Sequence, residues 1–150
     1  MVTVEELEIP RELDDSIAAR DFLACAEVRN AVDTLGFGSA DFAYPAEEEL
    51  PGWLDQVYTR RRSFAARVGG RIVAHAYHQT QPDGEGVDTA WQNVRVLPEF
   101  RGRGMGTALA THLEDLARSE GKRRILCWAA SPPAPGPRLD SPTGHGSLPA

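Results

Sequence analysis

The sequence predicts an α/β (α+β) domain, in which a mixed and mostly antiparallel sheet is flanked by helices. Two stretches with apolar residues at helical spacing enclose a middle segment in which the period changes to that of strands. A Gly-Gly pair divides the middle segment, as a tight hairpin turn would. A further apolar run after the second helical stretch adds one more strand to the sheet.

Length and composition limit the classes of protein. The 150 residues allow one domain, and 41% hydrophobic with 25% charged residues is typical of a soluble globular chain. The sequence lacks both the ~18–20-residue apolar run of a membrane span and the apolar segment of a secretory signal, so we expect a cytoplasmic protein with no membrane partner. A net charge of −6 argues against nucleic acid as a partner and mildly favours cationic small molecules. The two cysteines, Cys25 and Cys127, are too few to form a set of metal ligands. We therefore expect no metal.

The N-terminal third predicts a strand and two helices. Apolar alternation favours a strand over Val2–Ile9. Ser16 supplies cap chemistry for a helix over 17–35. Its expected core residues are Ile17, Phe22, Ala26, Val28, Ala31, Val32 and Leu35. A second short helix is expected to begin near Ala46, with a break at Pro51-Gly52 and helical spacing again over 53–58.

The middle of the chain predicts three antiparallel strands. These are 64–68, 71–78 and 87–97, with Gly69-Gly70 as the first turn. The run Arg60-Arg61-Arg62 just before them is interpreted as a solvated junction.

The last third predicts an amphipathic helix over 104–119 and a buried strand over 124–129 that includes Cys127. Residues 131–150 hold six of the eleven prolines and are expected to form an extended loop. We therefore expect a domain over 1–130 followed by a Pro/Gly-rich tail over 131–150.

One loop carries chemistry. Between the strand ending at Leu97 and the helix lies Arg101-Gly102-Arg103-Gly104-Met105-Gly106. A helix N-terminus has unpaired N–H groups and a partial positive charge, which suit a pyrophosphate. Glycines let a phosphate approach the backbone, and the two arginines add donors. The loop lacks the Gly-Lys-Ser/Thr of a P-loop, and its Gly-x-Gly-x-Gly spacing differs from that of a nicotinamide-binding fold.

The same loop resembles motif A of the GCN5-related N-acetyltransferases (GNAT), Arg/Gln-x-x-Gly-x-Gly/Ala. Arg101, Gly104 and Gly106 occupy the three motif positions. The order of predicted elements is also similar over about residues 1–129, and closest to the N-terminal part of tandem-domain members of the family.

The resemblance implies an enzyme that moves an acetyl group from acetyl-CoA to a primary amine of a small molecule, by direct attack in a ternary complex. It implies that main-chain groups of Val94 and Val96 pair with the pantetheine arm. It also implies a cofactor-binding loop that holds the pyrophosphate and consists of Arg101, Gly102, Arg103, Gly104, Met105, Gly106 and Thr107.

The resemblance also implies a C-terminal helix and a strand pair after residue 129, and this sequence shows neither. No general acid is therefore assigned, since Tyr44, Tyr58 and Tyr77 precede the motif. The alternative is a catalytically incomplete half-domain that binds CoA or forms a homodimer through an exposed strand edge.

Position alone suggests a general base. Glu85 and Asp88 flank the start of the strand that leads to the glycine loop, and either carboxylate would need a raised pKa. His75 and His78 have opposite parity on one strand, so they are not expected to share a metal.

Overall fold

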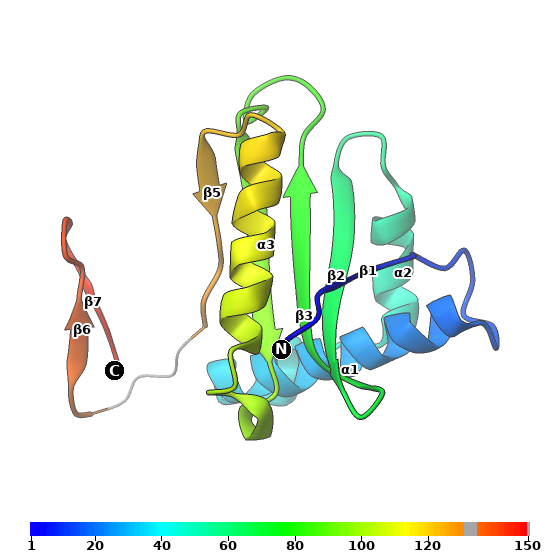
Figure 1. Ribbon diagram of the computed structural model, residues 1–150, viewed down its shortest axis with the longest axis horizontal. Helices are drawn as coiled ribbons and strands as arrows, with labels where there is room; N and C mark the ends of the chain where they lie inside the picture. Colours follow the sequence, from blue (N-terminus) through cyan, green and yellow to red (C-terminus); the bar gives the residue numbers. More distant parts are fainter. Residues whose placement is uncertain (131–134, 150) are drawn as a thin grey trace.

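A computed structural model describes residues 1–130 and 135–149. Its main sheet has the order β1-β2-β3-β4-β5. Figure 1 shows this sheet with α3 in front of it. The strands are β1 (Glu5–Leu7), β2 (Arg60–Val68), β3 (Arg71–Thr80), β4 (Thr89–Val96) and β5 (Arg124–Leu126). The first four pair antiparallel, and β5 pairs parallel to β4. The predicted mixed and mostly antiparallel sheet is confirmed.

Three α-helices cover the two faces of this sheet. They are α1 (Ile17–Phe37), α2 (Ala46–Leu54) and α3 (Met105–Ser119). The Ser16 hydroxyl oxygen caps α1 by accepting a hydrogen bond from the Ala19 N–H (3.2 Å). Even-numbered β4 residues contact α3, since Gln92 donates to Leu113 O, whereas odd-numbered Arg95 reaches Asp33 on α1. The alternation of β4 therefore sorts its side chains between the α3 face and the α1 face.

The hydrophobic core includes residues from both faces of the sheet. Its main cluster contains Val28 of α1, Phe64 of β2, and Leu109 and Leu113 of α3, all at most 2% exposed. A second cluster, which includes Phe22, Leu50 and Trp53, joins α2 to α1. Removing a large aliphatic side chain such as Leu109 is expected to cost about 2–5 kcal/mol. The sheet and α3 form one packed unit.

Several sequence-based boundaries differ from the structure. The arginine run at 60–62 is not a solvated junction but the first part of β2, where Arg62 pairs with Glu6 of β1 (2.7 Å). Within α2, Pro51 interrupts one helical hydrogen bond without ending the helix. The helix stops at Leu54, and the predicted helical residues Val57 and Tyr58 are 70% and 80% exposed. On α1, the predicted core residues Ile17, Ala31 and Leu35 are exposed.

The C-terminal part also differs from expectation. β5 ends at Leu126 rather than at 129 and all three of its residues are exposed, so Cys127 is exposed rather than buried. The predicted loop contains a small antiparallel hairpin, β6 (Arg138–Asp140) with β7 (Ser147–Pro149), while residues 131–134 and 150 lie outside the described residues. In the described ranges, no helix has the length and apolarity to cross a membrane.

Candidate functional site

The glycine loop ends in an open helix N-terminus. After the 3-10 turn Pro98–Phe100, Gly102 and Gly104 adopt positive φ values of 74° and 85°, which favour glycine. Gly104 is the N-cap of α3 and offers no side-chain acceptor. The first helical bond of α3 runs from Ala108 N to Gly104 O (2.9 Å), so the N–H groups of the preceding turn have no intrahelical acceptor. This turn suits an anion.

Both loop arginines are exposed and held by neutral carbonyl groups. Arg101 Nε donates to Val96 O (3.0 Å), and an Arg103 terminal nitrogen donates to Glu99 O (3.4 Å). Neither guanidinium forms an ion pair with a carboxylate in the part of the chain that the structure describes. Their positive charges therefore have no carboxylate counter-charge among the described residues. One N–H of the predicted pyrophosphate set, that of Arg101, is already donated to Pro98 O (3.2 Å).

The edge of β4 is open beside this loop. Leu97 N donates to Val73 O (3.0 Å), so the odd-numbered residues of this strand pair with β3. The main-chain groups of Val94 and Val96 consequently point to the other edge, where Val96 O already accepts the hydrogen bond from Arg101 Nε. There β5 pairs only with residues 89–91, and the two strands part from Gln92 onward. The structure thus brings the predicted residues Val94 and Val96 to the same edge as the glycine loop.

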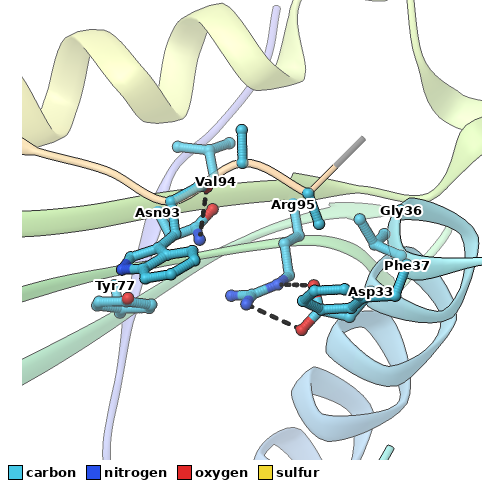
Figure 2. Close-up of a pocket in the computed structure, with 11 residues that line it drawn as sticks. Asp33, Gly36, Phe37, Tyr77, Asn93, Val94 and Arg95 are labelled. Atoms are coloured by element: carbon cyan, nitrogen blue, oxygen red, sulfur yellow. Dashed lines mark hydrogen bonds and ion pairs between the residues drawn. The ribbon is translucent and has the colours of Figure 1, made fainter. Parts of the chain in front are cut away.

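Two cavities meet where the strands part. One, of about 290 Å³, lies between β4 and α3 and is lined by Val94, Leu113 and Cys127. The other, of about 360 Å³, lies on the α1 face and is shown in Figure 2. Asn93, Val94 and Trp128 line both, so the opening joins the two faces of the sheet.

The wall of the α1-side cavity contains an ion pair and an amide among apolar side chains. Arg95 forms a two-pronged ion pair with Asp33 (2.8 and 3.0 Å), drawn as dashed lines in Figure 2. Tyr77 lies beside Asn93, its direct partner across β3 and β4. Sequence reasoning missed Asp33, Tyr77 and Arg95 as site residues. The alternation of side chains along β4 was the available signal. It groups the odd-numbered residues on one face of the strand, but it does not show which face lines a cavity.

The predicted general bases lie elsewhere. Glu85 and Asp88 belong to the turn before β4, at the end of the strand opposite the glycine loop. Hydrogen bonds from Arg124 and Thr89 hold the pKa of Asp88 below its ordinary value. The structure does not bring these two acids to the cavities with Val94.

The two strand histidines face opposite sides, as predicted. His75 Nε2 lies 3.0 Å from Ser63 Oγ on the α1 face, and His78 contacts Glu120 and Gln92 on the α3 face. Among the described residues, no three His, Cys, Asp or Glu side chains gather as a metal site.

Comparison with known proteins identifies the fold and the family to which this geometry corresponds. The sequence profile of the acetyltransferase (GNAT) family matches residues 30–134. Among solved structures, a GCN5-related N-acetyltransferase from Kribbella flavida is 24% identical, with a TM-score of 0.59 over 83% of this chain and 69% of that chain. The yncA putative acetyltransferase from Salmonella typhimurium, solved with its cofactor acetyl-CoA, is 20% identical, with a TM-score of 0.62 over 84% and 68% of the two chains.

A third similar structure is an aminoglycoside acetyltransferase from an uncultured soil metagenomic sample, in complex with sisomicin. It is 19% identical, with a TM-score of 0.60 over 85% of this chain and 77% of that chain. No curated protein matches the sequence significantly.

Proposed function

Because the chain belongs to the acetyltransferase (GNAT) family, we propose that it transfers an acetyl group from acetyl-CoA to a primary amine of a small molecule. The observation that carries the proposal is the open N-terminus of α3 beside the unpaired edge of β4. A pyrophosphate needs the first feature and a pantetheine amide chain needs the second.

Residues on the two faces of the sheet would bind different parts of the two reactants. The N–H groups from Gly102 to Thr107 and the guanidinium groups of Arg101 and Arg103 would bind the pyrophosphate. The main-chain groups of Val94 and Val96 would hold the pantetheine arm. The α1-side cavity would take the acceptor, with its amine at the opening beside Asn93.

The reaction at this opening is direct acyl transfer. The amine nitrogen forms a bond to the thioester carbonyl carbon, the C–S bond breaks, and the CoA sulfur leaves with a proton while the amine loses one. Holding the two reactants on either side of one opening lowers the activation free energy by several kcal/mol. Main-chain N–H groups of β4 polarise the carbonyl. Glu85 and Asp88, the proton acceptors predicted from position, lie at the end of β4 away from this opening, and the hydrogen bond from Arg124 lowers the pKa of Asp88.

The direct test is release of free CoA thiol from acetyl-CoA in the presence of a panel of primary amines. We expect turnover by the wild-type chain and its loss in Arg101→Glu/Gly104→Val. Arg118→Glu makes the same charge change at the other end of α3 and serves as the control. Unchanged turnover in the double variant would remove the glycine loop as the acetyl-CoA site.

A second candidate is a CoA-binding or dimerising half-domain without turnover. The observation that favours it is the apolar surface around β5, where Ile125, Leu126 and Trp128 are 43%, 43% and 70% exposed. An exposed strand edge of this kind pairs readily with a second copy. A stable dimer by light scattering, without thiol release for any amine, would favour this candidate.

A further inference from the structure

A third cavity continues the acceptor side of the opening. It measures about 190 Å³ and lies on the same face of the sheet, against α2. Tyr77 and Arg95 line both this cavity and the α1-side cavity, so the two cavities adjoin at these side chains. Because the first cavity reaches the opening at Asn93, the third cavity is the far end of the acceptor side.

The charge of this far end is opposite to that of the protein. The chain carries a net charge of −6, yet the cavity is lined by three arginines, Arg29, Arg61 and Arg95, and by one carboxylate, Glu49. Glu49 pairs with Arg29, and Asp33 pairs with Arg95. Arg61 is held by neutral oxygens instead, since its Nε donates to Gln79 Oε1 (2.8 Å) and its Nη1 to Gly52 O (3.1 Å).

Arg61 has no carboxylate partner in residues 1–130 and 135–149. Its guanidinium group also lies over the ring of Trp53, 5.8 Å from the centroid. The group is therefore fixed in position and still carries a charge that nothing in the described chain neutralises. A fixed guanidinium of this kind suits a planar carboxylate.

A buried histidine adds a second, independent indication. His75 lines the same cavity, is 5% exposed, and has no hydrogen-bond partner for Nδ1 within the described residues. Burial, with Arg95 and Arg29 nearby, lowers the pKa of His75 to about 3, so its imidazole is neutral. When the Ser63 hydroxyl donates to Nε2 (3.0 Å), Nδ1 carries the proton and needs an acceptor. Buried polar atoms nearly always have a hydrogen-bond partner, so the unpaired Nδ1 indicates that a bound ligand supplies one.

We propose that the far cavity binds a carboxylate of the acceptor, so that the acceptor is an amino acid whose reacting amine and carboxylate are several bonds apart. This inference rests on the proposed acetyl transfer. The β4 residue Asn93 pairs with Tyr77 of β3, which pairs with Ser63 of β2. Two strand spacings, about 10 Å, separate Asn93 from Ser63, and Arg61 lies two residues along β2 from Ser63, with its side chain reaching Gln79 in the wall of the cavity. A short α- or β-amino acid cannot place its amine at the opening and its carboxylate at Arg61, whereas 6-aminohexanoate can extend along the cavities.

The test is a calorimetric titration of the full chain with 6-aminohexanoate. The matched probes are 6-aminohexan-1-ol and 1,6-diaminohexane, which keep the length and remove or reverse the charge, and β-alanine, which is too short. We expect 6-aminohexanoate to bind at least tenfold more tightly than each of the three. Arg61→Gln should reduce its affinity to that of the alcohol. Arg60→Gln, an exposed neighbour on the other face of β2, should leave the affinity unchanged.

A kinetic measurement separates this role from a merely structural one. Arg61→Gln should raise KM for 6-aminohexanoate at least tenfold without changing kcat, and should leave KM for 6-aminohexan-1-ol unchanged. Equal affinity of the acid and the alcohol, or equal losses in the Arg60 and Arg61 variants, would overturn the inference. A wild-type chain that binds 6-aminohexanoate but not acetyl-CoA would contradict the proposed function and leave the carboxylate site standing, so the two failures are distinguishable.

Discussion

The side-chain amide of Asn93 donates a hydrogen bond to the main-chain oxygen of Trp128 (3.1 Å), where β4 and the segment after β5 have separated. This bond spans the opening that joins the α3-side and α1-side cavities. No ladder bond continues there, because the pairing of β4 with β5 ends at Trp91 and Leu126. In the proposed reaction, the amide lies where the acetyl group and the amine meet.

Asn93 should therefore matter more for rate than for binding of the acetyl donor. We expect Asn93→Ala to lower kcat about 10²-fold or more, since losing one donor near a developing oxyanion has effects of that size. Acetyl-CoA affinity should change less than threefold. Asn30→Ala removes a similar amide contact, to Tyr44 O, away from the opening and is the control. A tenfold loss of acetyl-CoA affinity with unchanged kcat would argue against this placement.

The two cysteines should differ in reactivity. Burial raises the pKa of the Cys25 thiol to about 12, whereas Cys127 is exposed and lines the α3-side cavity. Because the thiolate is the nucleophile, iodoacetamide should modify Cys127 and spare Cys25. Bound acetyl-CoA should slow the modification of Cys127 at least tenfold, measured by peptide mass spectrometry. Equal labelling with and without acetyl-CoA would place the pantetheine arm elsewhere.

Stability should depend on pH through His75. Its pKa is about 3 in the folded chain and near its ordinary 6.5 in the unfolded chain. The unfolded state therefore binds the proton first, and stability present above pH 6.5 is lost as pH falls toward 3. Between pH 6.5 and 5 we expect a loss of about 2 kcal/mol in the free energy of unfolding.

Denaturant titrations across this pH range measure the loss. His75→Gln should flatten the dependence, and His112→Gln, at an exposed position of α3, should not. A slope that is the same in wild type and in His75→Gln would show that His75 is protonated equally in both states.

Gly104 and Gly38 offer a matched pair for the glycine loop. Both have positive φ values, 85° and 71°, and both have open space where a Cβ would be added. Alanine at either position should cost about 1–2 kcal/mol of stability from backbone strain alone. Only Gly104→Ala should also weaken acetyl-CoA binding, about tenfold, because it alone borders the helix N-terminus. Melting curves and calorimetry on both variants check this, and equal losses of affinity would argue against the loop as the binding site.

The sequence predicted those elements whose signals are local. Gly69-Gly70 marks a hairpin because both residues adopt positive φ, and Ser16 marks the start of α1 because its hydroxyl caps the helix. The glycine loop was predictable for the same reason, since its residues are contiguous.

Features that depend on contacts between distant segments were not predictable. Arg62 lies in β2, where its side chain pairs with Glu6 of β1, 56 residues away. Cys127 is exposed because β5 is short and pairs on one side only. The α1-side cavity combines Asp33, Tyr77 and Arg95 from three elements, and the sequence did not show which face of β4 would line a cavity.

The central claim is that the open end of α3 and the open edge of β4 form an acetyl-CoA site, and a calorimetric titration of the chain with acetyl-CoA tests it most directly. We predict binding in the micromolar range, about −8 kcal/mol, and its loss in Arg101→Glu/Gly104→Val. A folded wild-type chain that shows no binding, or a double variant that binds as tightly as the wild type, would contradict the claim.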